Sequence, residues 1–310
     1  MPSPKLSKEL ARESNKMWIA ADRNFQKCER MFKIPRTTIQ FRIHSAQAMF
    51  PELFIEMNDS DAQSWTYPQF HSIEQDDLVI MIGSDAHIWP NNITIMMEAF
   101  SVLSKKLKPN VIVLNGDILD GAKVSRHGSI LGQNAPKITR EIESARLWID
   151  TLHFAKHKIW TMGNHDQRVD NYLANNAPEL DDYAGRISDR FPEWKFCWAT
   201  IINQVEIRHR FRSGIHAAWN NGLHSGISTV TGHTHQLQIT PIRNRNGTHW
   251  GVECGMLGDP THKAFEYAEG MTSRAQSGFI VITFKEGVML PPEPCELIHG
   301  RPVFRGDYVL

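Results

Sequence analysis

Five short polar strings, each directly after an apolar run, constrain this chain more than any other feature. They are SDAH at 84–87, NGD at 115–117, GNHD at 163–166, the histidine at 209 and GHTH at 232–235. A short apolar run that is closed by Gly or Asn is typical of a buried strand with both faces covered. We therefore expect Asp, Asn and His to gather at the carboxyl ends of strands, where open α/β sheets place their sites.

The side chains of these strings offer only oxygen and imidazole nitrogen as donors. The seven candidate ligands are Asp85, His87, Asp117, Asn164, His209, His233 and His235. These donors suit Mn, Fe, Zn, Ni or Mg more than metals that thiolates select, and Mn is the expected ion. The four cysteines are scattered without a CxxC pair, so neither a disulfide framework nor a thiolate zinc site is indicated. The sequence predicts a site for two divalent cations.

Two such ions would clamp the attacking and leaving oxygens of a displacement at phosphorus. Asp117 is the best candidate for a bridging carboxylate, because its NGD turn contains a glycine that allows close backbone approach. Water between the ions is expected to become the attacking hydroxide near neutral pH. His165 is placed to contact a phosphate oxygen and protonate the leaving alkoxide, and Asp166 is expected to orient that imidazole.

The order of the motifs resembles that of the calcineurin-like metallophosphoesterases, which is DxH, GD, GNH(D/E), H and GHxH. Four of these five motifs are intact between residues 85 and 235. The resemblance implies an α/β sandwich of two mixed β-sheets flanked by helices, with His165 as the catalytic histidine. It also implies two ligand sets that share one aspartate. They are Asp85, His87, Asp117 and His235 for one metal, and Asp117, Asn164, His209 and His233 for the other.

The fourth motif departs from the family pattern, which usually ends a strand with His-Gly. Here the strand-like stretch 205–209 ends in His209 and is followed by Arg210. His216 is the competing ligand. We prefer His209, because an alternating stretch leads into it and because the 24 residues before His233 leave room for a crossover helix over 217–225. In that case His216 would begin the helix and lie close to the site.

Other polar residues follow the motifs in the same connections. Asp120 lies one helical turn beyond Asp117 and is a further possible ligand or a neighbour of the ligands. Arg126, His127 and Arg168 are candidates to contact substrate phosphate. An arginine fork pairs with phosphate oxygens, so the two arginines would face either a non-bridging oxygen of the reacting phosphate or a flanking phosphate. Solvated loop arginines with surface ion pairs are the alternative.

The first 45 residues differ in charge from the remainder. They hold ten Lys or Arg and four acids, a surplus of six basic residues in a chain that is formally neutral overall. Residues 46–310 therefore carry a surplus of six acids. A basic segment joined to an acidic domain indicates a separate partner for that segment, and polyanions are the usual one.

Hydrophobic spacing in this segment predicts three amphipathic helices, the first around 10–19, the second over 25–31 and the third over 37–48. The stretch between the last two resembles the helix-turn-helix of homeodomain-like regulators and resolvases. Thr37 is the expected N-cap. The residues expected to face DNA phosphates or base edges are Arg36, Thr37, Thr38, Gln40 and Arg42. A small helical bundle whose basic residues are only solvated is the alternative.

These patterns divide the chain into a helix-turn-helix-like domain at 1–50, a linker at 51–70 and a catalytic domain at 71–310. The β-rich stretches 237–242, 248–255 and 278–284 are expected to form the second sheet, and the Pro-rich residues 288–310 an extended surface tail.

We therefore expect a phosphodiesterase or nuclease that acts on DNA or another nucleic acid. The motif wording also resembles phage-encoded members that join a helix-turn-helix to this catalytic domain. The alternatives are a phosphomonoesterase or cyclic-nucleotide phosphodiesterase on a small molecule, and a DNA-binding regulator without catalysis. No apolar run approaches a membrane span and no signal-peptide core is visible, so a cytoplasmic location is expected, in the host if the protein is phage-encoded. The sequence leaves the oligomeric state open.

Overall fold

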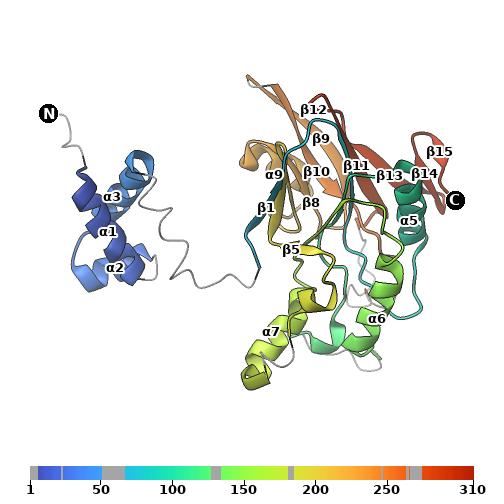
Figure 1. Cartoon of the computed structure of the whole chain (residues 1–310), viewed down its shortest axis with the longest axis horizontal. Helices are drawn as coiled ribbons and strands as arrows, with labels where there is room; N and C mark the ends of the chain where they lie inside the picture. The colour runs from blue at the N-terminus through green and yellow to red at the C-terminus, as the bar shows by residue number, and fades with distance from the viewer. Residues whose placement is uncertain are drawn as a thin grey trace. The chain divides into compact units, whose positions relative to one another are not determined.

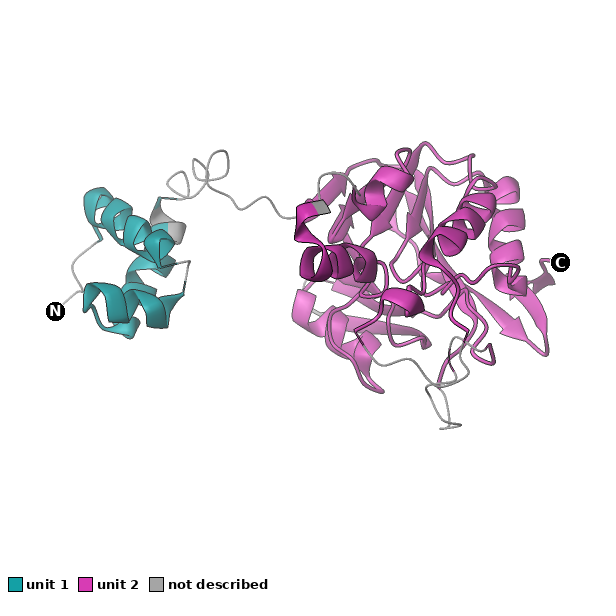
Figure 2. Ribbon diagram, turned by 90° about the horizontal axis from the view of Figure 1, so that it is seen from below, with its two compact units in different colours: residues 1–66 teal, residues 67–310 magenta. Residues whose placement is uncertain are grey.

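The computed structural model describes residues 6–21, 24–50, 67–126, 134–180, 185–245, 247–262, 265 and 274–310. The chain divides into unit 1, Met1–Thr66, and unit 2, Tyr67–Leu310, which Figure 2 colours separately. The predicted linker falls largely on residues 51–66, outside the described residues, while residues 67–70 belong to unit 2.

Unit 1 contains three helices, α1 (Lys8–Ala20), α2 (Phe25–Phe32) and α3 (Arg36–Met49) (Figure 1). Side-chain oxygens of Ser7 and Asn24 accept from backbone N–H groups and start the first two helices. The buried residues at helical spacing on α3 are Ile39, Ile43 and Ala46. The predicted helical order is therefore present, with each helix packing an apolar face against the other two.

The prediction that Thr37 caps the third helix is wrong. Helix α3 begins one residue earlier, at Arg36, with Pro35 at the N-cap and no side-chain cap. Proline fixes its own φ and lacks an N–H, so it suits the entry to a helix, where that donor has no intrahelical partner. Lys33 adopts a left-handed conformation at the C-terminal end of α2. Three residues separate α2 from α3.

Unit 2 is built on two β-sheets. The six-stranded sheet has the order β1 (Phe70–Ile73), β6 (Ala199–Ile202), β7 (Val205–Arg208), β8 (Ser228–Thr231), β10 (Gly247–Cys254) and β9 (Leu237–Asn244). The nine-stranded sheet has the order β15 (Asp307–Tyr308), β14 (Arg301–Phe304), β13 (Glu293–Ile298), β11 (Gly278–Lys285), β2 (Leu78–Gly83), β3 (Val111–Leu114), β4 (His157–Thr161) and β5 (Lys195–Cys197), with β12 (Val288–Met289) beside β11. Parallel and antiparallel pairs occur in both, as expected for two mixed sheets.

The central strands are apolar throughout because they supply two cores. Along β2, Ile80 and Ile82 enter a core between the two sheets, whereas Met81 enters a core on the opposite face. Strand β3 alternates in the same way, with Val113 in the first core and Ile112 in the second. Successive side chains of a strand point to opposite faces, so a strand covered on both sides needs a continuous apolar run.

Helices cover the outer faces of this sandwich. Helices α5 (Ile95–Leu107) and α6 (Ile138–Ile149) pack in the second core, where Phe100 lies 4.9 Å from Phe279 of β11 between ring centroids. Helix α9 (Ala217–Ser225) packs on β10, where an added Cβ at Gly251 would meet the carbonyl oxygen of Ala218 at 1.8 Å. The remaining helical segments are α7 (Gln167–Asn176), η1 (Ala122–Val124), η2 (Pro178–Leu180) and η3 (Ile187–Arg190).

In the described part of the chain, no helix combines the length and apolar character needed to cross a membrane.

Two predictions about the later strands are wrong. Residues 278–285 form β11, which pairs with β2 in the nine-stranded sheet instead of joining β9 and β10. Its alternate residues enter both cores, which suits a strand beside the central β2. Residues 288–310 form four strands and not a surface tail, because Cys295 and Phe304 reach the second core.

Candidate metal centre

The candidate ligands lie just beyond the carboxyl ends of five strands. Asp85, Asp117 and Asn164 follow β2, β3 and β4, which are parallel neighbours in one sheet. His209 follows β7, and the GHTH loop follows its parallel neighbour β8 in the other sheet. Because the sheets pack face to face, these ends meet at one edge of the sandwich, as the sequence predicts.

The backbone at the candidate ligands is strained. Five of the seven adopt left-handed φ values, namely Asp85 (53°), His87 (42°), Asp117 (52°), His233 (69°) and His235 (59°). This conformation costs a residue with a Cβ about 1 kcal/mol or more, and such strain clusters at active sites and ligand clamps. The loops therefore hold these side chains at a conformational cost that packing elsewhere offsets.

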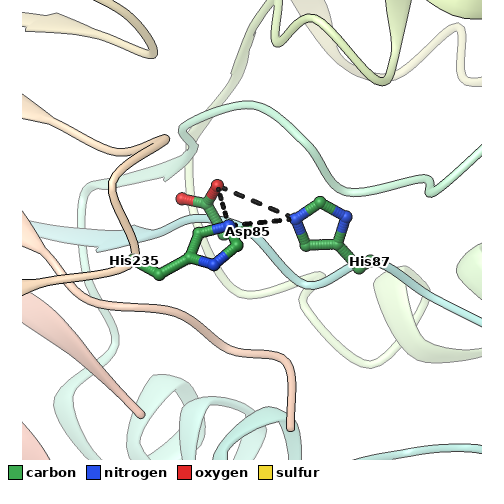
Figure 3. Close-up of side chains that lie close together, drawn as sticks. All are labelled: Asp85, His87 and His235. Carbon is green, nitrogen blue, oxygen red and sulfur yellow. Dashed lines mark hydrogen bonds and ion pairs between the residues drawn. The ribbon is translucent and has the colours of Figure 1, made fainter. Parts of the chain in front are cut away.

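One group of donors consists of Asp85, His87 and His235 (Figure 3). The Nε2 atom of His235 lies 3.2 Å from Asp85 Oδ1 and 3.3 Å from His87 Nε2. His87 Nε2 is 3.9 Å from the same carboxylate oxygen. Two imidazole nitrogens and a carboxylate oxygen thus face a common point, as ligands of one cation do.

A second group consists of Asp117, His209 and His233. His209 Nε2 and Asp117 Oδ2 lie 3.1 Å apart, yet both are buried atoms without a hydrogen-bond partner. The buried Oδ1 of Asn164 also lacks a partner. Buried polar atoms of a folded protein are normally paired, so three orphans on predicted ligands indicate that these atoms serve a cation. The residues present therefore fit a dinuclear site.

Outer contacts fix which nitrogen of His209 and of His87 faces the centre. His209 Nδ1 lies 2.7 Å from the carbonyl oxygen of Asn115, and His87 Nδ1 lies 3.3 Å from Asp120 Oδ1. Each Nδ1–H donates to its oxygen, so Nε2 is the nitrogen that is turned towards the centre, the arrangement that orients metal-ligating histidines. Asp120 also accepts from Trp89 Nε1 at 2.9 Å. Asp120 is therefore placed as a partner of the ligands.

Charges around the second group shift its titration. Burial alone would lower the pKa of His209, but the carboxylates of Asp117 and Asp85 raise it to about 9. Burial disfavours the charged form of Asp117 too, but His209 and His165 hold the pKa of this carboxyl well below its ordinary value. Asp117 is thus an anion surrounded by imidazoles, which suits a ligand shared by two cations.

His165 lies beside the ligands but is oriented differently from our expectation. Its Nδ1 lies 2.9 Å from the carbonyl oxygen and 3.1 Å from Oδ1 of Asp120. Its Nε2 lies 3.9 Å from Asp117 Oδ2 and 3.0 Å from Nη2 of Arg168. The prediction that Asp166 orients this imidazole is wrong, because Asp120 occupies that position.

Asp166 instead holds the loop that carries Asp117. Its carboxylate accepts from the backbone N–H groups of Asp117, Ile118, Leu119 and Gly163 and from Trp160 Nε1, at 2.9–3.1 Å. The N–H donors saturate both oxygens, so none is left for His165. Burial, with the charge of Asp117, raises the pKa of Asp166 to about 6.

Two motif glycines are required by the packing of ligand side chains. A Cβ on Gly163 would lie 2.1 Å from Asp117 Oδ1, and one on Gly116 would lie 2.5 Å from the His209 ring. Gly116 also has a φ of 79°. The glycines therefore make room for a neighbouring ligand side chain, whereas we expected the glycine of the NGD turn to allow close approach of the backbone to the metals.

The remaining predicted residues differ in their distance from the donor groups and in their exposure. His216 is exposed at the N-cap of α9 and belongs to none of the donor groups in the described residues, whereas His209 lies against Asp117. His127 lies outside the described residues. Arg168 donates through Nη1 to the Asp120 carbonyl at 2.7 Å, so both of its terminal nitrogens contact residues of the centre. Arg126 is exposed.

A cleft of about 760 Å³ opens beside the centre. Asn164 and His233 line it together with Arg126, Arg168 and Arg210. We did not assign Arg210 a function from the sequence. Its position was a signal, because it directly follows His209, where the family usually has glycine. Sequence reasoning also did not identify Glu141, which accepts from the N–H groups of Asp120 and Gly121, because it lies on a helix distant in sequence.

Comparison with known proteins places the centre within a family. Residues 78–246, more than half of the chain, match the family model described as calcineurin-like phosphoesterase. The gene 54 proteins of Mycobacterium phages D29 and L5 are each 29% identical to this chain, over 158 and 162 residues, which is 45% of this chain and 61% of each relative. The match therefore spans less than two thirds of these curated relatives.

The solved structures to which this chain is similar include a phosphoesterase, Yfce, from E. coli, with 14% identity and a TM-score of 0.32 over 69% of this chain and 97% of that one. A dimetal phosphatase from Danio rerio has 10% identity and a TM-score of 0.36 over 67% and 93% of the two chains.

Proposed function

The chain belongs to the calcineurin-like phosphoesterase family, and we propose that it is a dinuclear-metal-dependent phosphodiesterase that hydrolyses nucleic acid. Family membership implies metal-dependent hydrolysis of phosphoric esters. The choice of a diester in a nucleic acid, and of DNA in particular, is the proposal.

One observation carries the hydrolytic part. Asp117 Oδ2, His209 Nε2 and Asn164 Oδ1 are buried without a hydrogen bond at the ends of three different strands. With the group of Asp85, His87 and His235, they complete two sets of oxygen and nitrogen donors. Two divalent cations bound there would activate water and neutralise charge on the phosphate.

His165 is the residue placed to transfer a proton. Its Nδ1–H is fixed on Asp120, so Nε2 is the nitrogen that can face a leaving oxygen. Burial alone would lower the pKa of His165, but the carboxylates of Asp117 and Asp120 raise it. A general acid requires the imidazolium, which the Asp120 carboxylate on Nδ1 stabilises. Arg168 contacts Nε2 as well and keeps the ring in place when the nitrogen is neutral.

Two features favour nucleic acid as the substrate. Unit 1 has three helices with a three-residue turn before α3, and its Arg36 and Thr37 are exposed, with Thr38, Gln40 and Arg42 partly exposed. We propose that this face binds DNA phosphates and base edges in a helix-turn-helix arrangement. The cleft beside the metal centre is lined by arginines, which suits a polyanion.

Turnover of defined esters tests the proposal. The full-length protein, reconstituted separately with Mn, Ni, Zn and Mg, is assayed on bis(p-nitrophenyl) phosphate, p-nitrophenyl phosphate, and single- and double-stranded DNA. Hydrolysis of the diester and of DNA is expected, with Mn among the most effective ions. Activity confined to the monoester would overturn the assignment to phosphodiesters. DNA binding without hydrolysis of any ester by metal-loaded protein would indicate a regulator.

A further inference from the structure

Arg210 interrupts the family pattern at the fourth motif and lines the cleft beside the metal centre. We propose that Arg210 and Arg126 form a second phosphate site, which binds the phosphodiester next to the one being cleaved. The substrate would then be an oligonucleotide strand with at least two consecutive phosphodiester linkages. This inference rests on the proposed function and specifies its substrate.

Both arginines are available for a ligand. Arg126 and Arg210 are exposed, and neither has a hydrogen bond or ion pair with a described residue. Arg168 differs, because its guanidinium is committed to Asp120 and His165. A guanidinium fork pairs with two oxygens of one phosphate, so Arg126 and Arg210, which have no partner within the described part of the chain, are suited to bind an anion.

The cleft is continuous with the metal centre. Asn164 and His233, candidate ligands of the second cation, contribute to its lining. Arg210 follows His209 directly, so its backbone lies one residue from a third ligand. A phosphate held by Arg210 would therefore be a close neighbour of the scissile phosphate along a strand.

The wall formed by α7 also suits a nucleic-acid strand. Asn171 and Asn175, one helical turn apart, line the cleft with their polar side chains. Asp170, the acid of this helix, is directed elsewhere, since it accepts from the Tyr67 hydroxyl at 2.5 Å and from the N–H of Ile187 at 3.1 Å. Among the described residues lining the cleft there is no carboxylate that would repel phosphate.

The test compares thymidine oligomers that differ by one linkage. Full-length Mn-loaded protein is assayed on the dinucleoside monophosphate TpT and on the trinucleotide TpTpT, which carries two linkages. These oligomers are short single strands, so they offer unit 1 no duplex to bind. We expect kcat/KM for TpTpT to exceed that for TpT by about tenfold or more, beyond the factor of about two from the extra cleavable bond.

Variants then test which arginine produces the preference for TpTpT over TpT. In Arg210→Ala the ratio should fall towards two, and Arg210→Lys should retain part of it, because lysine keeps the charge and loses the fork. Arg126→Ala should lower the ratio as well. Arg245→Ala, at an exposed arginine in the β9–β10 hairpin, is the matched control and should keep the wild-type ratio. Metal content is measured for every variant, because Arg210 adjoins His209.

Each outcome separates the two proposals. A wild-type ratio of about two or less, with both oligomers cleaved, would overturn the second phosphate site and leave nucleic-acid hydrolysis standing. A preference that persists in metal-replete Arg210→Ala would overturn the assignment to Arg210. Cleavage of DNA but of neither oligomer would overturn the second phosphate site alone. Hydrolysis of bis(p-nitrophenyl) phosphate with cleavage of neither DNA nor either oligomer would overturn both proposals.

Discussion

Asp120 Oδ1 lies 3.1 Å from Nδ1 of His165 and 3.3 Å from Nδ1 of His87, so one carboxylate holds both the expected acid and an expected metal ligand. Burial alone would raise the pKa of Asp120, but hydrogen bonds from these two imidazoles lower it far below its ordinary value. It is therefore an anion at any working pH and a strong acceptor for both rings.

Asp120→Asn should reduce kcat on a chromogenic diester by about 10- to 100-fold, the range seen when an outer partner of a metal-site histidine is removed. The pH profile should shift as well, because an amide no longer stabilises the imidazolium of His165. Asp307→Asn, at an exposed aspartate in β15, is the control. An Asp120→Asn enzyme with wild-type kcat and pH profile would show that Asp120 does not position His165.

Asp117→Asn should lower turnover by about a thousandfold or more, since an amide cannot provide the anionic oxygen that both ligand sets share. The far-UV circular dichroism spectrum should be unchanged. Retention of most activity in metal-replete protein would contradict the shared-ligand role.

Gly163→Ala should destabilise the protein by about 1–3 kcal/mol and reduce metal content, because the new Cβ would lie 2.1 Å from Oδ1 and 2.2 Å from N of Asp117. Gly306→Ala is the control, since Gly306 has a φ of 83° but open space around its Cβ position. It should lose about 1 kcal/mol from backbone strain and keep its metal. Equal metal content in the two variants would show that the close approach at Gly163 is unimportant.

Glu141 makes stability depend on pH. Burial raises the pKa of Glu141 from 4.5 to about 8, so between these values the folded state retains a proton that the unfolded state has lost. The stability that the protonated acid contributes is complete below about pH 4.5 and is lost as the pH rises towards 8. Glu141→Gln removes this dependence, and its amide oxygen can still accept from Asp120 and Gly121.

From pH 5 to pH 8, the free energy of unfolding of Glu141→Gln should therefore improve relative to the wild type, by on the order of 1–3 kcal/mol. Denaturant unfolding at the two pH values measures this. Glu143→Gln, on the exposed face of the same helix, should show no such trend. Parallel curves for Glu141→Gln and the wild type would contradict the raised pKa.

The double variant Arg36→Ala and Arg42→Ala should weaken DNA binding and reduce the salt dependence of the binding constant, by about one unit of slope for each arginine that pairs with a phosphate in the wild type. Hydrolysis of a small chromogenic diester should be unaffected, because unit 1 contributes no donor to the metal centre in the described residues. Arg12→Ala, at an exposed arginine on α1, is the control. Unchanged DNA binding in the double variant would refute the helix-turn-helix interpretation.

The sequence by itself determined the position and chemistry of the candidate centre, because ligand type and strand-end placement are local properties. An apolar run that ends in NGD or GNHD specifies both a strand and the donors after it, whatever the strand later pairs with. The same locality explains the three helices of unit 1, whose apolar spacing is visible in the chain.

Only the tertiary structure decided which side chains support the donors. Asp166 is adjacent to His165 in sequence, yet it is saturated by backbone N–H groups, and Asp120, from another connection, takes the expected contact. The pairing of β11 with β2 and the strands of residues 288–310 were likewise settled by two cores that the chain forms only when distant segments meet. The arginines of the cleft come from three separate connections. Packing brings them together, so no local sequence pattern predicts that they line one cleft.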